Sequence, residues 1–443
     1  MKKTTVKYPF LTEDVEIYER ENGHKIVLAH KEGDMSNVST WVKTGSINED
    51  DRINGISHFL EHLMFKGTHK HKAGEFDRIL EAKGAIVNAA TWKDYTFYYV
   101  TLPKGADCKD LNLAIELHAD MMLDPILPEE EIGAPFDLND TTVTDKRERH
   151  VVIEEIRMRK DQNWTKIYNA CNYNMYTKHP YKRDVIGTPE IISQVTRDDI
   201  MKYYQTFYSP ENMTTIIVGD FDKDKILKKV EKEFDFKGRK NAPKKINEID
   251  TPTQTKKIIE SSAHVNTAYF MYGWLGPFAK DIKGTICLDI ISIILGDGTS
   301  SRLYQNLIEK QPEPIFNMVN SEHYQFKEGN NFFIQANCKS DKKDIAIELV
   351  EKELANLITN PITEQEMLKA KKKIKSRFAY SAETVSEIGE TIGYYMTVCE
   401  DLKLIEEYLK DLDGITIEDL KCTIDTYLNI NNSVLSILVP EGN

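Results

Sequence analysis

The sequence lacks the cysteine spacing of a disulfide framework or a zinc knuckle. Its six cysteines include no CxxC pair and no dense cluster. Small secreted domains and structural zinc sites depend on such spacing. We therefore expect buried or idle thiols without a function at Cys108, Cys171, Cys287, Cys338, Cys399 and Cys422.

Long apolar runs are also missing. No stretch approaches the roughly 18 consecutive apolar residues that a membrane-spanning helix needs. The N-terminal segment "MKKTTVKYPF" has lysines but no apolar run behind them of the kind that a signal peptide carries. We expect a cytoplasmic protein that does not cross a membrane, or a periplasmic or secreted one if a signal peptide has been removed.

The chain has no excess of positive charge. Its formal net charge is −13 at pH 7, and no stripe of basic residues alternates with aromatic residues. Nucleic-acid phosphates require a basic surface, so we expect no nucleic-acid partner. The lysine run from Lys369 to Lys373 is typical of the solvent-facing side of a helix.

An internal repeat is present at long period. The segment "VTRDDIMKYYQTFYSPENMTTIIVGD" begins at Val195, and "ITIEDLKCTIDTYLNINNSVLSILVP" begins at Ile415, an offset of 415 − 195 = 220 residues. Both segments predict a helix capped by threonine, a short turn and an apolar strand. This pattern indicates a tandem duplication, although chance similarity between two helix-then-strand segments would look the same over this length.

The duplication predicts two domains in the 443-residue chain. Residues 237–255 are rich in proline, threonine and charge and predict a linker between an N-terminal domain, 1–236, and a homologous C-terminal domain, 256–443. Apolar segments such as "KIVLAH", "TFYYVTL" and "NFFIQANC" predict strands between longer helical segments. We expect an α+β fold in which each domain has a mostly antiparallel β-sheet covered by α-helices.

The strongest chemical motif is "HFLEH", at residues 58–62. On a helix, His58, Glu61 and His62 project into one arc, because residues three and four apart share a face. Two imidazoles can bind zinc, and a neighbouring carboxylate can take a proton from water. The alternative is a pair of core histidines satisfied by hydrogen bonds.

A third ligand is needed on another element, and "ERHVVIEE" at residues 148–155 supplies the best candidates. Glu148 and Glu155 are two helical turns apart and share a face, whereas Glu154 points about 100° away. Val151, Val152 and Ile156 form an apolar remainder. Taken alone, the segment reads more readily as a charged surface helix.

Together, "HFLEH" and "ERHVVIEE" resemble the pitrilysin/insulinase family of zinc peptidases, the inverzincins, and in particular their bacterial processing-peptidase members. The resemblance covers essentially the whole chain. It implies zinc binding by His58, His62 and Glu155, a general base at Glu61, and a supporting acid of the catalytic site at Glu148.

The resemblance extends to "GAIVNAATWKDYTFYY", which is similar to the family's substrate-binding strand. Asn88, Ala89 and Ala90 would offer a sheet edge to an extended peptide, a mode that reads main chain rather than side chains. Without the resemblance, an ordinary strand after a glycine turn explains the segment equally well.

Two features depart from the family pattern. Residues 132–147 lengthen the segment before the ligand helix, so that 155 − 62 = 93 residues separate His62 from Glu155; glycine, proline, aspartate and threonine there predict a surface loop. Many family members also carry an arginine and a tyrosine seven residues apart in the second half. This chain has Ile308 at the arginine position and Ile315 or Phe316 at the tyrosine position.

The missing pair bears on the partners. In resembling bacterial proteins this pattern goes with a homologous subunit that supplies the arginine and tyrosine, so a heterodimer is the first expectation. A homodimer, or a monomer that uses Tyr304 or Tyr324 instead, is the alternative.

The combined expectation is a zinc-dependent endopeptidase with one Zn²⁺ per chain, which cleaves peptides or unfolded segments held in a chamber between the two halves. The alternative is a zinc-binding scaffold subunit, proteolytically inactive, within a heterodimeric peptidase. The intact "HFLEH" favours the enzyme, and the missing arginine and tyrosine favour the scaffold.

Overall fold

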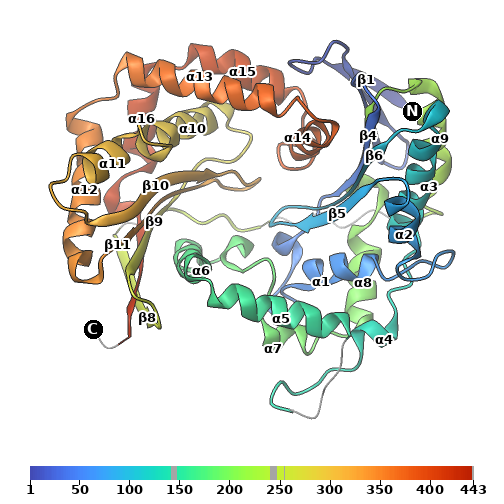
Figure 1. Cartoon of the computed structure of the whole chain (residues 1–443), viewed down its shortest axis with the longest axis horizontal. Helices are drawn as coiled ribbons and strands as arrows, with labels where there is room; N and C mark the ends of the chain where they lie inside the picture. The colour runs from blue at the N-terminus through green and yellow to red at the C-terminus, as the bar shows by residue number, and fades with distance from the viewer. Residues whose placement is uncertain (141–146, 240–246, 254, 442–443) are drawn as a thin grey trace. The chain divides into compact units, whose positions relative to one another are not determined.

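A computed structural model describes residues 1–140, 147–239, 247–253 and 255–441 (Figure 1). The chain forms two compact units. The first comprises Met1–Met158, Asp184–Ile246 and Ala379–Glu406, and the second comprises Arg159–Arg183, Asn247–Phe378 and Glu407–Asn443. Each unit is built around its own β-sheet.

The sheet of the first unit has seven strands in the order β1-β2-β3-β7-β4-β6-β5. Their bounds are Lys2–Val6 for β1, Val15–Glu19 for β2, Lys25–His30 for β3, Met35–Val42 for β4, Ile86–Thr91 for β5, Thr96–Pro103 for β6 and Met213–Gly219 for β7. Every neighbouring pair is antiparallel except β3 with β7. Strand β5 therefore lies at one edge, hydrogen-bonded to β6.

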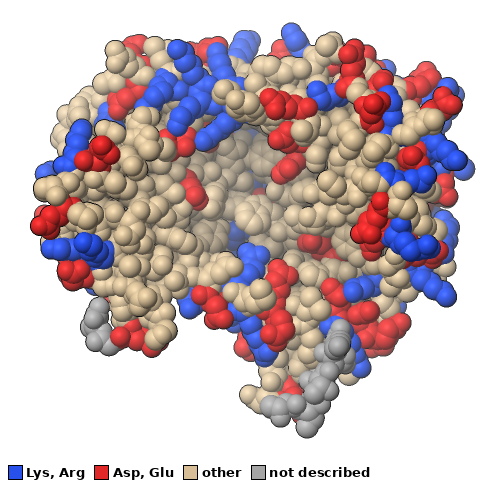
Figure 2. Space-filling view, viewed as in Figure 1, with Lys and Arg blue, Asp and Glu red and all other residues tan. Residues whose placement is uncertain are grey.

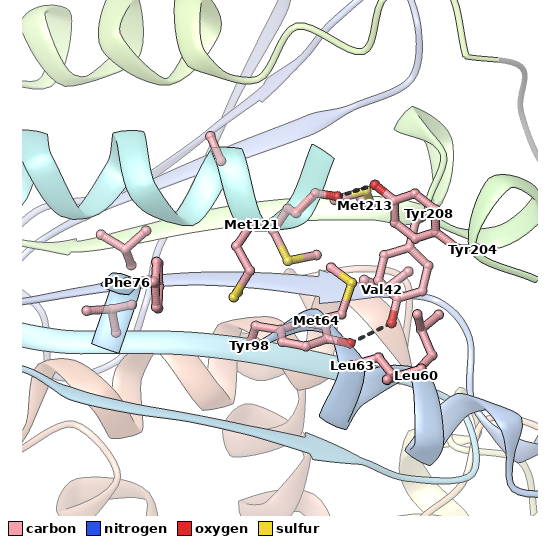
Figure 3. Close-up of a cluster of buried hydrophobic side chains, with 14 of the residues drawn as sticks. Val42, Leu60, Leu63, Met64, Phe76, Tyr98, Met121, Tyr204, Tyr208 and Met213 are labelled. Carbon is pink, nitrogen blue, oxygen red and sulfur yellow. Dashed lines mark hydrogen bonds between the residues drawn. The ribbon is translucent and has the colours of Figure 1, made fainter. Parts of the chain in front are cut away.

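Helices of the N-terminal half cover one face of this sheet (Figure 1). They include α1 (Ile56–Met64), α2 (Glu75–Glu81), α3 (Lys109–Leu123), α8 (Arg197–Phe207) and α9 (Lys223–Glu233). Figure 3 shows the core that joins α1 to the sheet: Leu60, Leu63 and Met64 pack beside Tyr98 of β6, whose hydroxyl lies 2.7 Å from that of Tyr208. This core fixes α1, and with it the "HFLEH" motif, against the strands.

The sheet of the second unit has five strands in the order β10-β11-β9-β12-β8. Their bounds are Lys257–Ala263 for β8, Ala268–Leu275 for β9, Phe316–Tyr324 for β10, Asn331–Cys338 for β11 and Val434–Pro440 for β12. Only β12 with β8 is parallel. The order and the single parallel pair match the run β5-β6-β4-β7-β3 of the first sheet, so the duplication predicted from the sequence is confirmed.

The repeated segments are alike in detail. Thr196 caps α8 and Thr416 caps α16 (Ile417–Tyr427), each in a capping box with the aspartate three residues later. The other helices of the C-terminal half include α10 (Ile282–Gly296), α11 (Arg302–Tyr304), α12 (Lys343–Thr359), α13 (Glu364–Tyr380) and α15 (Leu404–Gly414). The predicted α+β architecture, with one helix-covered sheet for each half, is correct.

One feature was not expected from the sequence: each half contributes a helix to the sheet of the other. Helix α14 (Val385–Thr397) packs on β4 and β7 of the first unit, where Gly393 lies against Trp41 so closely that a Cβ would sit 2.0 Å from the indole. Helix α6 (Asn163–Met175) packs on β9 and β12 of the second. The two compact units are therefore not contiguous in sequence.

The remaining helices of the first half are α4 (Glu129–Ile132), α5 (Glu148–Asp161) and α7 (Pro189–Ile192). In the segment predicted to be a surface loop, residues 133–140 contain no helix or strand, and residues 141–146 lie outside the described residues. Much of the predicted linker, residues 240–246 and 254, lies outside them as well. No helix in the described ranges is long and apolar enough to span a membrane.

Basic side chains gather over α13 in Figure 2. Nearby acids neutralise several of them: Asp297 pairs with Lys373 and Arg377, and Asp413 pairs with Lys375. The prediction that the whole lysine run faces solvent is wrong for Lys371, which is 7% exposed and donates to two backbone carbonyls. Burial of a lysine requires such acceptors.

Candidate metal centre

The "HFLEH" motif lies on α1 as predicted. The side chains of Ile56, Phe59, Leu60 and Leu63 are fully buried and hold one face of the helix in the core. His58 and Glu61 are each 9% exposed on the adjacent face, where a polar cluster begins. Periodicity alone places the three motif side chains on one side of the helix.

The second part of the motif lies on α5, which is anchored rather than a surface helix. Arg149 is 1% exposed and its guanidinium donates to the backbone carbonyls of Gly133, Ser193 and Val195. Val152 and Ile156 are buried, but the prediction that Val151 joins this apolar remainder is wrong, because its side chain is 47% exposed. It lies one turn before Glu155, on the exposed face of the helix.

Three donor atoms converge between α1 and α5. The ligand atoms of His58, His62 and Glu155 lie within 4.8 Å of one another. Glu155 Oε2 is 3.7 Å from His58 Nε2 and 3.4 Å from His62 Nε2. Two ligand atoms about 2.0–2.1 Å from a tetrahedral zinc ion are separated by about 3.3 Å, so the distances from Glu155 to the two imidazoles are close to those of a zinc site.

Glu148 and Lys66 fix the orientation of His62. Glu148 Oε1 lies 2.8 Å from His62 Nδ1, which leaves Nε2 directed toward Glu155. Lys66 holds the other oxygen of Glu148. A carboxylate that accepts from the remote nitrogen of a histidine is the usual support of a metal ligand. Glu154 lies away from this group, as the helical spacing predicts: its side chain is 62% exposed.

The electrostatics of this group are those of a site that attracts a cation. Burial would lower the pKa of His62, but hydrogen bonds to Glu148 and Glu155 outweigh burial and raise it to about 9. Burial acts to raise the pKa of Glu148, and its contacts with His62 and Lys66 reverse this and lower it. Glu148 and Glu155 thus both stabilise a positive charge on His62, and a bound metal ion can supply that charge instead of a proton.

Glu61 lies close enough to His62 and Glu155 to interact with them electrostatically, and it is held by a residue of β5. The hydroxyl of Thr91, the last residue of β5, donates to Glu61 Oε2. Burial raises the pKa of Glu61, and the bond from Thr91 moderates that increase. A carboxylate with a raised pKa is a better proton acceptor at neutral pH than an exposed one.

The three residues expected to bind substrate lie on β5, at the edge of the first sheet. Asn88 and Ala90 are exposed and Ala89 is half-buried. The side-chain oxygen of Asn88 accepts from the backbone N–H of Ala89 at 2.9 Å. An added strand would have to displace this local bond to pair there.

Sequence reasoning did not single out Lys66 or Thr91. A signal for Lys66 was available, because it follows His62 by four residues and could have been placed on the same side. Thr91 carried no such signal, because its contact with Glu61 depends on how β5 packs against α1.

Comparison with known proteins agrees with this geometry. Residues 25–188 match the family model described as Insulinase (Peptidase family M16), and residues 194–374 match the one described as Peptidase M16 inactive domain. Two full-length relatives are the Uncharacterized zinc protease YmxG of Bacillus subtilis, 26% identical, and the Zinc protease PqqE of Helicobacter pylori, 28% identical. The alignments cover 96% and 95% of this chain, and 98% and 91% of the relatives.

Solved structures give the same result. A protease from Helicobacter pylori superposes with a TM-score of 0.85 at 27% identity, over 97% of this chain and 100% of that one. A Pseudomonas fluorescens structure described as a peptidase M16 inactive domain shares the fold, with a TM-score of 0.85 at 17% identity over 97% of this chain and 98% of that one. The chain therefore belongs to the M16 insulinase family of zinc proteases.

Proposed function

We propose that this chain is a zinc-dependent endopeptidase that hydrolyses peptides or unfolded segments and holds one Zn²⁺ through His58, His62 and Glu155. The convergence of three ligand atoms within 4.8 Å carries the proposal. Glu61 beside them supplies the proton acceptor that hydrolysis needs.

A bound zinc ion supplies Lewis acidity, which lowers the pKa of water and polarises a peptide carbonyl. Glu148 orients His62 toward the ion. Glu61 accepts a proton from water on the carboxylate oxygen that Thr91 does not occupy, and returns it to the leaving amine. The raised pKa of Glu61 suits both transfers, because the same group must take and release the proton near neutral pH.

An extended peptide would pair with the outer edge of β5 at Asn88, Ala89 and Ala90, in place of the local bond between Asn88 and Ala89. Main-chain pairing fits a peptidase that accepts varied sequences. Because Thr91 ends this strand and contacts Glu61, a peptide paired along β5 runs toward the proposed base.

The test is hydrolysis of casein and of quenched fluorescent peptides by the zinc-loaded chain and by Glu61→Gln. We expect Glu61→Gln to keep its zinc and lose at least about 100-fold in kcat, the lower range for a general base. Glu154→Gln is the matched control, because this exposed carboxylate pairs with Arg157 and is expected to leave activity unchanged. Equal cleavage by wild type and Glu61→Gln would refute the assignment.

A second candidate is the zinc-binding scaffold subunit, and the segment around Ile308 favours it. Ile308 and Ile315 are partly buried and pack against the core of the second unit, so neither presents a polar group. Neither side chain can stabilise charge that develops on a scissile carbonyl. A homologous partner that supplies arginine and tyrosine would complete such a site.

Tyrosines of this chain are the alternative source. The hydroxyl of Tyr324 donates to Glu322 at 2.5 Å, so this phenol would have to leave a carboxylate before it could serve a substrate. Tyr304 lies in α11, next to the segment with Ile308. These observations make a partner subunit the preferred proposal over a self-sufficient monomer.

Assays of the chain alone and mixed with a candidate homologue separate the self-sufficient enzyme, the heterodimer and the inactive scaffold. Cleavage by the chain alone supports the self-sufficient enzyme, and cleavage that requires the partner and is lost in Glu61→Gln supports the heterodimer. Zinc retention without cleavage in every pairing would favour the scaffold.

A further inference from the structure

Helix α1 begins without a side-chain cap of its own. Its N-cap residue is Gly55, at φ 95°, and a Cβ there would lie 2.5 Å from the carbonyl oxygen of Ile186. Glycine fits this close approach but offers no side chain to the first N–H groups of the helix. Those groups need an acceptor from elsewhere, because they are buried.

Glu49, six residues before Gly55, supplies that acceptor. Its Oε2 accepts from the backbone N–H of Gly55 at 2.7 Å and from Asn54 Nδ2 at 2.7 Å. Its Oε1 accepts from the backbone N–H of Ser57 at 2.9 Å and from Ser57 Oγ at 2.6 Å. The side chain is 0% exposed, so all four bonds lie away from water.

The neighbours of this carboxylate favour its charged form. Burial raises the pKa of Glu49 above its usual value, and the four hydrogen-bond donors around its oxygens limit that rise. The helix N-terminus adds a favourable positive partial charge for an anion at this place.

The same cap is tied to the body of the first unit. Ser57 Oγ lies 2.8 Å from the hydroxyl of Tyr203 on α8, and that hydroxyl lies 2.6 Å from Thr44 Oγ1. The residue after Ser57 is His58, and His62 follows one turn later. Any rotation or displacement of the first turn of α1 therefore moves both histidines relative to Glu155.

We propose that Glu49 is a positioning residue for the metal centre: its carboxylate caps α1 and sets the rotation of the helix, so that His58 and His62 meet Glu155. It touches none of the proposed ligands. The inference rests on the proposed zinc site. Substitution of Glu49 should therefore change the affinity for metal and the geometry of the metal centre in a protein that is still folded.

The informative variant is Glu49→Gln. Either orientation of the amide places an NH₂ group against two donors, with no change in side-chain length. Loss of charge-assisted bonds corresponds to about a 10- to 100-fold weakening of metal affinity. Ser57→Ala is a milder variant that removes one bond of the four, and we expect about a 3- to 10-fold weakening from it on the same scale.

The matched control is Glu353→Gln. Glu353 is another buried carboxylate, 9% exposed, that accepts from Asn306 and Asn356 in the second unit. The Glu353→Gln substitution should lower stability without altering the metal centre.

The experiment titrates metal-free protein with Zn²⁺ and Co²⁺ in chelator buffers, and records the visible spectrum of the Co²⁺ form. Circular dichroism at the assay temperature verifies that each variant is folded. We expect weaker binding and a changed Co²⁺ spectrum in Glu49→Gln and Ser57→Ala, and wild-type behaviour in Glu353→Gln.

Wild-type affinity and spectrum in folded Glu49→Gln would overturn the inference and leave the proposed function intact. If Glu49→Gln does not fold, the same result in Ser57→Ala overturns it. Failure of the wild type to bind either metal would refute the proposed function instead.

Discussion

Replacement of Lys66 by methionine should weaken zinc binding without unfolding the chain. Lys66 is 26% exposed, whereas the Glu148 carboxylate that it pairs with is only 12% exposed. Methionine keeps much of the length of the side chain and removes the charge. Glu148 then loses its cationic partner while it still has to accept from His62 Nδ1.

The structure bounds the size of this effect. Removing one partner from a fully buried ion pair destabilises a protein by about 3–5 kcal/mol. Here Lys66 is partly solvated and Glu148 keeps its bond to His62, so we expect a smaller effect. Loss of support for a metal-binding histidine typically weakens metal affinity by about 10- to 100-fold, which corresponds to about 1.4–2.7 kcal/mol.

The assay is competition of the metal-free protein with a chelator of known zinc affinity. Lys66→Arg should retain most of the affinity, because a guanidinium can also pair with the carboxylate. Lys229→Met is the matched control: Lys229 is 20% exposed in the first unit and pairs with Glu116 and Glu233, on α3 and α9. Unchanged zinc affinity in folded Lys66→Met would refute the view that this ion pair supports His62.

Three further predictions follow from other parts of the structure. Gly393→Ala should destabilise the chain by about 1–3 kcal/mol in urea unfolding, because its Cβ would overlap Trp41. Burial would raise the pKa of Glu366, but its arginine and threonine partners lower it to about 2, below the usual 4.5. Glu366→Gln should therefore lose stability at pH 7 relative to wild type, and this difference should disappear as pH falls from about 4.5 through 2. Thr91→Val should shift the acidic limb of the kcat/KM profile to higher pH, because Glu61 loses a bond that lowers its pKa.

Each of these has a control and a contrary result. Gly414→Ala is the control: its Cβ meets no atom within 4 Å, so the stability should be nearly unchanged. Equal stability of Gly393→Ala and wild type would contradict the packing of α14 on the first sheet. A stability difference for Glu366→Gln that persists below pH 2 would show that its pair with Arg302 is not the cause. Thr91→Ser keeps the hydroxyl and should keep the wild-type pH profile. An unchanged acidic limb in Thr91→Val would show that Thr91 does not lower the pKa of Glu61.

Local periodicity predicted much of the site. His58, Glu61 and His62 share a face of α1 because spacings of three and four residues always do so on a helix. The same rule separated Glu155 from its exposed neighbour Glu154. The repeat at Val195 and Ile415 predicted a tandem duplication, because both copies carry the same cap and the same apolar strand, and the shared strand order of the two sheets agrees with it.

Contacts between segments far apart in sequence could not be predicted in this way. Helix α14 has an ordinary amphipathic pattern, and nothing in that pattern states which sheet it covers. Burial of Lys371 depends on two carbonyls more than 40 residues away, at Asp413 and Ile415. Glu49 precedes its helix by a loop, so a search for a cap at the N-cap position finds only Gly55.

X-ray absorption at the zinc edge of the zinc-loaded chain tests the central claim most directly. We predict one zinc per chain with two imidazole nitrogens at about 2.0–2.1 Å and carboxylate oxygen at a similar distance. Glu155→Gln should weaken binding and alter this shell, whereas Glu154→Gln should not. A zinc environment without imidazole scattering, or one unchanged in Glu155→Gln, would contradict the assignment of His58, His62 and Glu155.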